Sequence, residues 1–381
     1  MDRRKEIMEN FYSDNLEPAA KIVVIGVGGA GNNAVNRMID EEITNVEFYV
    51  ANTDKQALGT SKAPNRIILG EELTGGLGAG GDPKAGKEAA EASADKIREI
   101  VKDANMVFIA AGMGGGTGTG AAPVIANIAK HIEGRDILVV AIVTRPFSFE
   151  GKNRVLNSIK GLNDLKAEVD SLIVVSNDKL LLNDSNALIG NAFQNADTIL
   201  AQSVRTVVNL ICLPAIINLD FADVRNTLWK SGVGLIGYGS GSGPNRAKDA
   251  ANQAISCPLI ETGIQGARRA VVAITCGTQV SLFEAQECVN LLIEAAGGEL
   301  DIKFGMSIND HLTDEIFVSV IASDFENDID FTAPTNVAPI RPVEQQELEE
   351  RLIDTAKREQ ERNFEEDSII PSFLRDNKDK N

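Results

Sequence analysis

Gly112-Met113-Gly114-Gly115-Gly116-Thr117-Gly118-Thr119-Gly120 joins an apolar run, Met106–Ala111, to a run typical of a helix start, Ala121–Ala126. Six of the nine residues are glycine, so the backbone can turn tightly and leave its N–H groups open to a ligand. A helix N-terminus behind such a loop favours phosphate, because its first N–H groups are unpaired and carry partial positive charge. A merely flexible turn would need neither the strand nor the helix. The stretch therefore predicts a phosphate-binding loop.

A second glycine-rich stretch lies near the start of the chain. Ile22–Ile25 is typical of a buried parallel strand, and Gly26–Asn33 leads from it into a helix that should end near Asp40. Glycines at positions 26, 28 and 31 fit Gly-x-Gly-x-x-Gly, the dinucleotide fingerprint, and Asp54 follows about 20 residues later. A nicotinamide-linked dehydrogenase is therefore one interpretation.

A third glycine-rich stretch, Gly75–Gly81, runs into Gly81–Glu88, which matches the Gly-x4-Gly-Lys phosphate loop of many nucleotidases. Glu88 stands where that loop needs a hydroxyl for magnesium, and Pro83 removes a backbone donor, so we reject this match. Asp82-Pro83 instead predicts the start of a helix that runs to about Val101. The glycines before it remain a candidate loop.

Strands and helices alternate through the first half of the chain. Beyond the two strands already named, the pattern predicts strands at Ile137–Val143 and Ser171–Ser176, with a helix at Glu150–Lys166 between them. This alternation indicates a mostly parallel sheet wrapped by helices. We expect the three glycine-rich loops to meet at the carboxyl edge of its strands, where open α/β sheets bind ligands.

One long helix, from Ala187 to Cys212, should end before Pro214. Its apolar positions are spread too widely around the helix for a single stripe, which predicts burial between two domains. Beyond it the pattern predicts a second α+β unit. Its expected elements are a helix that ends at Lys230, a helix at 247–256, a strand at 270–275, a helix at 282–295 and a strand at 316–322.

Composition limits the function classes. The chain has 381 residues, a formal net charge of −18 and 43% hydrophobic residues, an ordinary composition with room for two domains. The negative charge argues against a general nucleic-acid binder, because it repels phosphate. The four cysteines form no Cys-x-x-Cys pair and there are two histidines, so no disulfide framework, zinc site or histidine-based catalysis is indicated. No apolar signal core and no apolar run of about 18 residues is found, so we expect a cytoplasmic protein.

The two ends of the sequence differ from its middle. Residues 1–19 are polar and mixed in charge, which predicts a flexible N-terminal segment. Residues 331–366 are expected to form a charged linker. Within this region, residues 341–367 are expected to be either a solvated linker without regular structure or a single exposed helix. Ile369–Arg375 is a short apolar cluster at the end of this tether, so residues 367–381 are interpreted as a partner-binding tail.

Taken together, the motifs resemble the tubulin/FtsZ family of GTPases over about residues 20–325. Gly112–Gly120 is similar to the family signature Gly-Gly-Gly-Thr-Gly-(Thr/Ser)-Gly, and the other matching motifs are Gly28–Asn33, Asn52–Asp54, Gly78–Gly80, Pro146–Lys152, Asn177–Leu180 and Asn218–Asp223. The resemblance implies an α/β fold: a Rossmann-like parallel-sheet GTPase domain (20–185), a long central helix (186–213) and a second α+β domain (214–330). A dehydrogenase becomes much less favoured, because it needs no second and third phosphate loop.

The resemblance assigns GTP binding to residues of these loops. They are Gly29, Ala30, Gly31, Asn32, Asn33, Asn52, Ala79, Gly80, Gly116, Thr117 and Gly118. It also places Glu150 and Arg154 near the ribose and phosphates. An i,i+4 salt bridge on a helix explains that pair equally well.

Guanine selectivity is assigned by the resemblance to Phe193 and Asp197, four residues apart on one face of the central helix. Phe193 would stack on the base, and Asp197 would accept hydrogen bonds from N1–H and the exocyclic amine of guanine. Adenine lacks this pair of donors. The helix pattern alone would favour a simpler interpretation, with Phe193 in the core and Asp197 solvated.

Catalytic residues are missing from the phosphate loop itself, since Gly112–Gly120 contains no Asp, Glu or His to orient a water. The resemblance places them in a loop of the neighbouring subunit in a head-to-tail filament. The residues concerned are Asn218, Asp220 and Asp223, with Mg²⁺ helping to neutralise the phosphates. Asp220 and Asp223 also fit a helix capping box, a role that one carboxylate can fill while the other faces out.

The implied function is a cell-division scaffold, a polymer of this chain that hydrolyses GTP to GDP where subunits meet. Its tail would bind membrane-linked adaptor proteins through Ile370, Pro371, Phe373, Leu374 and Arg375. Neither nucleic acid nor direct membrane insertion is expected, and the polymer would concentrate in the cytoplasm at the mid-cell division site. The alternative is a non-division tubulin-like filament GTPase, against which the tail argues.

Overall fold

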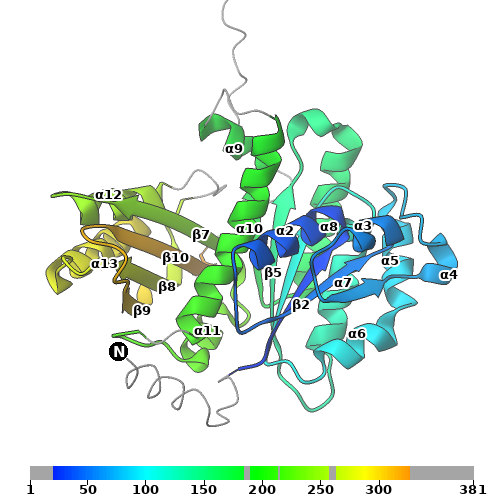
Figure 1. Cartoon of the computed structure of the whole chain (residues 1–381), viewed down its shortest axis with the longest axis horizontal. Coiled ribbons are helices and arrows are strands. Elements are labelled where there is room, and N and C mark those ends of the chain that lie inside the picture. Colours follow the sequence, from blue (N-terminus) through cyan, green and yellow to red (C-terminus); the bar gives the residue numbers. More distant parts are fainter. Residues whose placement is uncertain (1–19, 184–188, 213–214, 257–262, 327–381) are drawn as a thin grey trace, which may run out of the picture. The chain divides into compact units, whose positions relative to one another are not determined.

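A computed structural model describes residues 20–183, 189–212, 215–256 and 263–326. Their strands form one sheet in the order β3-β2-β1-β4-β5-β6-β7-β10-β8-β9 (Figure 1). The strands are β1 (Ile22–Val27), β2 (Glu47–Asn52), β3 (Asn65–Ile68), β4 (Met106–Gly112), β5 (Leu138–Arg145), β6 (Ser171–Ser176), β7 (Gly232–Gly241), β8 (Ala267–Cys276), β9 (Asp301–Ile308) and β10 (Ile316–Phe325).

Helices cover both faces of this sheet (Figure 1). They are α2 (Gly28–Asp40), α3 (Lys55–Gly59), α4 (Glu71–Thr74), α5 (Pro83–Glu91), α6 (Ala94–Val101), α7 (Thr117–Lys130), the 3-10 turn η1 (Ser148–Glu150), α8 (Lys152–Glu168), α9 (Asn177–Asn183), α10 (Ile189–Cys212), α11 (Phe221–Leu228), α12 (Arg246–Ile255) and α13 (Leu282–Ala296). None of the helices in the described part of the chain is both long and apolar enough to cross a membrane.

The parallel half of the sheet has a core on each face. Strand β1 shows why its sequence is apolar throughout: Val23 and Ile25 face one core, and Ile22 and Val24 face the other. Helices α5, α6, α7 and α8 cover the first face, and α2 and α10 cover the second. The predicted parallel sheet wrapped by helices is confirmed.

The strand order reverses between β1 and β4, which lie side by side in parallel register from Ile22 opposite Met106 to Val27 opposite Ala111. From this pair the chain builds β2 and β3 on one side and β5 and β6 on the other. Connections leave such a point in opposite directions and open a crevice at the carboxyl ends of the two strands. Two of the three glycine-rich loops follow these two strands directly.

Helix α10 is buried along one face and exposed on the other, at Gln194 and Asn209, so the expectation that its apolar positions exclude a single buried stripe is wrong. Leu200, Val204 and Val207 are fully buried in the core that β1 and β4 share with Ile236 of β7 and Ile321 of β10. Strand β7 connects the two parts of the sheet, because it pairs in parallel with β6 and antiparallel with β10. The sequence pattern predicted neither β7 nor the edge strands β3 and β9.

Two helix boundaries were predicted wrongly. The helix expected over residues 82–101 is two helices, α5 and α6, separated at Ser93, whose hydroxyl accepts a hydrogen bond from the Gly70 N–H at 3.0 Å. Asp82 does cap α5, accepting from the Lys84 N–H at 2.9 Å. The helix expected from Glu150 begins at Lys152, because Gly151 has φ of 108°, outside the right-handed helical region.

Candidate functional site

The three glycine-rich loops meet at the crevice between β1 and β4. A Cβ atom on Gly112 would lie 2.6 Å from Cβ of Ala30, and one on Gly116 would lie 2.9 Å from Cβ of Ala79. Real Cβ contacts are longer, so glycine at both positions lets the loops touch. The first turn of α2, the loop before α5 and the loop before α7 therefore form one surface, as predicted.

Both α2 and α7 begin at this surface. A Cβ on Gly29, in the first turn of α2, would meet nothing within 4 Å, so the backbone there faces open space. Thr53, which follows β2, shares a hydrogen bond of 2.7 Å with the hydroxyl of Thr117, the first residue of α7. Two helix N-termini with unpaired N–H groups thus converge on one place, which suits a polyphosphate.

Asparagine side chains hold the first loop in shape. Asn32 is 3% exposed, and its amide nitrogen, in the orientation that satisfies the hydrogen bonds, donates to the carbonyls of Gly26 and Gly28. Its amide oxygen then accepts from the buried Asn52 amide at 3.3 Å. Asn32 and Asn52 therefore support the loop from below, whereas Asn33 is exposed on it. Thr53 belongs to the motif Asn52–Asp54, but no role in the site was predicted for it.

Aromatic rings lie beside the start of α10. Phe147 is fully buried and meets Phe193 edge-on, with ring centroids 5.1 Å apart, while its other neighbour, Phe149, stacks on it at 5.0 Å. Phe193 remains 41% exposed. The interpretation of Phe193 as a core residue is therefore wrong, and an exposed ring on a fixed support can stack on a flat ligand.

Asp197 lies one turn further along α10 and is partly buried. Burial raises the pKa of its carboxyl to about 7, and the nearby charge of Arg37 opposes that rise. The interpretation of Asp197 as a simply solvated residue is therefore wrong. A desolvated carboxylate favours a ligand that donates hydrogen bonds to it, as guanine does.

Glu150 and Arg154 form the ion pair that their spacing predicted. The other oxygen of Glu150, Oε1, accepts from the Phe147 N–H at 2.8 Å, so the carboxylate also fixes the turn below the aromatic rings. Arg154 is mostly exposed on α8. The assignment of this pair to ribose and phosphate stays a prediction.

Asp220 and Asp223 form the predicted capping box at the start of α11. Oδ1 of Asp220 accepts from the Asp223 N–H at 2.8 Å, and Oδ2 of Asp223 accepts from the Asp220 N–H at 3.4 Å. The cap does not use the second oxygen of either carboxylate. Asn218 closes the preceding loop by accepting from the Ala215 N–H at 2.7 Å, and Ile217 pairs with Met306 of β9.

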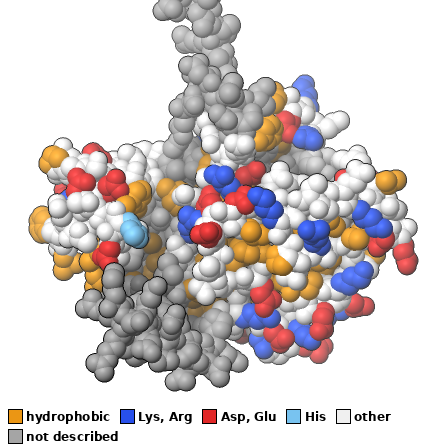
Figure 2. Space-filling view, viewed as in Figure 1, with side chains coloured by type: hydrophobic (Ala, Val, Ile, Leu, Met, Phe, Trp, Pro, Cys, Tyr) orange, Lys and Arg blue, Asp and Glu red, His pale blue; other side chains and the backbone are white. Residues whose placement is uncertain are grey.

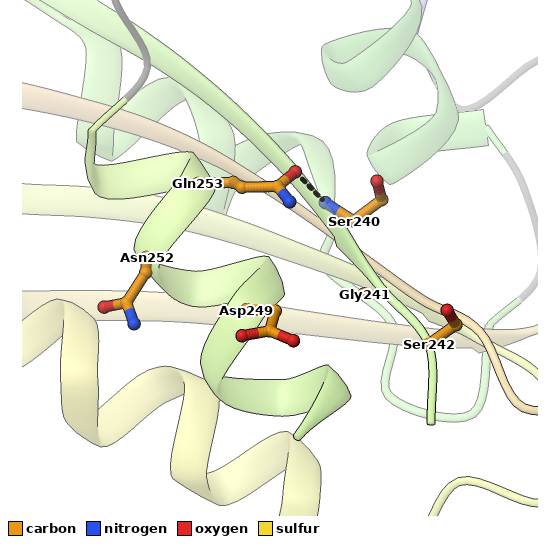
Figure 3. Close-up of a pocket in the computed structure, with 6 residues that line it drawn as sticks. All are labelled: Ser240, Gly241, Ser242, Asp249, Asn252 and Gln253. Carbon is orange, nitrogen blue, oxygen red and sulfur yellow. Dashed lines mark hydrogen bonds between the residues drawn. The ribbon is translucent and has the colours of Figure 1, made fainter. Parts of the chain in front are cut away.

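Two hollows lie away from this surface. One of about 360 Å³ lies between the end of β7 and α12 and is lined by Ser240, Gly241, Ser242, Asp249, Asn252 and Gln253 (Figure 3). Its lining is polar and mostly exposed, and Gln253 already accepts from the Ser240 N–H, so it offers little to hold a ligand. A cleft of about 1110 Å³ runs between α10 and the β7–β10 part of the sheet and includes none of the three loops.

The residues that suggested other nucleotide sites have structural roles. Asp54 accepts from the N–H groups of Gln56 and Ala57 and so caps α3. No strand precedes Gly81–Glu88, and Gly86 packs on the carbonyl of Gly116. On the coloured part of the face in Figure 2, basic and acidic side chains are interspersed, with no broad basic surface for nucleic acid there.

Comparison with known proteins agrees with this geometry. A family model described as the Tubulin/FtsZ family, GTPase domain, matches residues 21–183, and one described as the FtsZ family, C-terminal domain, matches residues 232–326. An FtsZ dimer from M. jannaschii has 39% sequence identity and a TM-score of 0.74, with 85% of this chain and 92% of that chain covered. The chain belongs to the tubulin/FtsZ family.

Two further structures extend the comparison. A point mutant of FtsZ from M. jannaschii has 38% identity and a TM-score of 0.76, with 87% of this chain and 98% of that chain covered. CetZ2 from Haloferax volcanii, a GTPγS-bound protofilament, shares the fold at 22% identity and a TM-score of 0.68, with 88% and 99% covered.

Membership of the tubulin/FtsZ family makes the chain a GTPase and excludes the dehydrogenase interpretation. The two-part tubulin/FtsZ fold expected from the motifs is confirmed. The predicted tail residues Ile370, Pro371, Phe373, Leu374 and Arg375 lie outside the described residues, so their role stays a prediction.

Proposed function

We propose that this chain polymerises head to tail and hydrolyses GTP where successive subunits meet. One subunit would hold the nucleotide on its three loops, with the phosphates at the N-termini of α2 and α7 and the guanine at Phe193 and Asp197. The next subunit would supply Asp220 and Asp223. An FtsZ structure 39% identical to this chain is a dimer, which supports self-association.

The position of α11 is the observation that carries the proposal. Figure 1 shows α9, which follows β6, near one end of α10, and α11 near the other end. Helix α10 has 24 residues, which corresponds to ~36 Å of helix. Because α9 leaves the carboxyl end of β6, it marks the edge of the sheet that carries the nucleotide loops. Asp220 and Asp223, at the start of α11, lie at the opposite end of α10. They are therefore too far from the nucleotide loops of their own subunit. In a head-to-tail stack they would face the loops of the next subunit, and such a contact does not close on itself.

The chemistry asks little of the protein beyond position and charge. The carboxylate oxygens of Asp220 and Asp223 that the cap does not use would orient and polarise the attacking water. Among the described residues no group of three or more His, Cys, Asp or Glu side chains could hold a metal ion. Mg²⁺ would bind mainly through the phosphates of GTP, where it would neutralise charge.

We further propose that the filament is the scaffold of the division ring, concentrated in the cytoplasm at mid-cell. The sequence of residues 367–381 supports this role, because an apolar cluster on a charged tether is typical of a docking peptide for membrane-linked adaptors. A non-division filament GTPase is the alternative. A fluorescent fusion of the full chain that labels the cell evenly throughout division would favour the alternative.

Turnover measured across a dilution series tests the shared site. We expect GTP-specific hydrolysis whose rate per subunit rises with protein concentration, together with light scattering that appears with GTP and magnesium. ATP should support neither signal. A rate per subunit that stays constant over a wide range of concentration would contradict catalysis at the contact.

A further inference from the structure

A carboxylate at the end of α2 connects two parts of the nucleotide site. Glu41 follows α2 directly, and its side chain is 16% exposed. Its Oε1 accepts from Nε of Arg37, one turn earlier on α2, at 3.0 Å. Its Oε2 lies 3.1 Å from Nη2 of Arg205 on α10, and the same Nη2 donates to the carbonyl oxygen of Glu41 at 2.5 Å.

Arg205 compensates two negative groups at this helix end. The carbonyl of Glu41, the C-cap residue of α2, lies at the negative end of the helix dipole, which a guanidinium neutralises. Oε2 of Glu41 is buried and makes no hydrogen bond to the described residues. Arg205 is the positive charge paired with this oxygen, and Arg37 pairs with the other oxygen, so together they offset the loss of water from the carboxylate.

The same network reaches the base end of the site. Burial raises the pKa of Asp197, and Arg37 lies close enough to lower it. Charges of opposite sign therefore alternate from Asp197 through Arg37 and Glu41 to Arg205. The series starts on α10, crosses to α2 and returns to α10, and Figure 1 shows these two helices next to each other.

Helices α2 and α10 carry different parts of the site. Helix α2 begins in the phosphate loop, and α10 carries Phe193 and Asp197. Between them, Val35 and Met38 of α2 share an apolar core with Leu200 and Val204 of α10. Apolar contact is not directional. By itself it fixes how far apart two helices lie better than it fixes how far one helix is shifted along the other. An ion pair together with a hydrogen bond from the same guanidinium to the backbone carbonyl does fix that shift.

We propose that Glu41 and Arg205 are positioning residues for nucleotide binding, and that their contact sets the spacing between the base subsite and the phosphate subsite. The inference rests on the proposed placement of guanine at Phe193 and Asp197. A ligand that spans both subsites benefits from the correct spacing, because the second half then binds at high effective concentration. A ligand that fills one subsite does not sense the spacing.

Competition binding with dilute subunits tests this difference. GTP, guanosine and inorganic tripolyphosphate would each displace a fluorescent GTP analogue from the wild type, Arg205→Gln, Glu41→Gln and the double variant. We expect GTP affinity to fall about tenfold in each single variant. The double variant should lose no more than either single variant, because both remove the same contact. In Arg205→Gln, which leaves the Arg37–Glu41 pair in place, the affinities of guanosine and tripolyphosphate should stay unchanged.

Asp40→Asn is the matched control. Asp40 precedes Glu41 in the chain, and its carboxylate lies 2.6 Å from Nζ of Lys62 on the exposed surface. This ion pair does not involve α10. This variant should bind GTP as the wild type does. Thermal melts confirm that each variant is folded.

Two results would overturn the inference. One is an unchanged GTP affinity in both folded single variants, and the other is an equal loss for GTP and for the two fragments. Neither readout involves assembly, so the proposed shared catalytic site can fail or hold independently of this result.

Discussion

The hydroxyls of Thr53 and Thr117 lie 2.7 Å apart and share a hydrogen bond, although 64 residues separate them in the sequence. Thr53 is fully buried behind the end of β2, and Thr117 begins α7. The bond therefore ties the end of the second strand to the start of α7 through the protein's own side chains. A site held in this way needs little rearrangement when the nucleotide enters, so less of the binding free energy is lost to ordering.

Gly116→Ala should destabilise the protein. The new Cβ would lie 2.9 Å from both Cβ of Ala79 and the backbone nitrogen of Asp82, so the loop before α5 must move. Overpacking of this kind costs about 1–3 kcal/mol of the free energy of unfolding. Thermal melts without nucleotide measure it. Gly115→Ala is the control, because its Cβ would meet nothing within 4 Å, and an equal loss in both variants would contradict the packing argument.

Guanine affinity should depend on pH through Asp197, whose pKa burial raises to about 7. Guanine donates to the ionised carboxylate, so affinity should rise as pH increases towards 8 and level off above the pKa. At pH 6, one unit below it, binding should be about tenfold weaker.

Guanosine is the appropriate ligand for this titration, because it has no phosphate that titrates in the same range. Asp197→Asn should bind more weakly at pH 8, with no such dependence on pH. A parallel pH profile in the variant would assign the effect to another group.

The raised pKa of Asp197 has the opposite effect on the stability of the protein without nucleotide. Between the ordinary pKa of the carboxyl and about 7, the folded state binds more protons than the unfolded state. Its contribution to stability therefore falls as pH rises through that window.

Asp223→Ala separates catalysis from capping. The bond of Asp223 to the Asp220 N–H is long, at 3.4 Å, so its loss should cost only about 0.5 kcal/mol of stability. If Asp223 acts on the nucleotide of a neighbour, the variant should bind GTP and assemble but hydrolyse GTP very slowly. Mixing it with wild-type subunits should then lower turnover by more than dilution does. A variant that melts earlier yet keeps full turnover would leave Asp223 as a cap alone.

Deletion of residues 367–381 should leave GTP hydrolysis and filament formation unchanged while abolishing adaptor binding. The apolar cluster Ile369–Arg375 is separated from the GTPase part by a long charged stretch. Turnover and pull-down of membrane-linked division proteins, measured on the same preparations, check both halves of this expectation. Loss of turnover in the truncated chain would show that the tail packs on the folded part.

Patterns confined to neighbouring residues predicted much of the fold. The strand at Ser171–Ser176 was predicted with its observed bounds, and the helix at 282–295 ends one residue short of α13. Both have a single, uninterrupted pattern of apolar residues. The glycine loops were recognisable for the same reason, since a strand, a glycine run and a helix follow one another directly in the chain.

Strand β7 shows where local pattern fails. Its sequence, GVGLIGYGSG, has five glycines in ten residues, and glycine disfavours strands. Helix α12 explains why glycine is needed in this strand. A Cβ on Gly237 would lie 2.1 Å from the carbonyl oxygen of Ala254, and a Cβ on Gly239 would lie 1.9 Å from the carbonyl oxygen of Ala250. The helix backbone packs directly on the strand, and nothing in the strand itself reveals that neighbour.

The sequence by itself determined which segments could bind a nucleotide, because glycine runs at strand ends and helix starts are local features. Tertiary structure alone decided which side chains hold those segments in register. Arg205 and Glu41 are 164 residues apart, and in the sequence each looks like an ordinary surface charge. Their contact exists because α2 and α10 bury apolar faces in the same core, which brings two otherwise unremarkable charges within bonding distance.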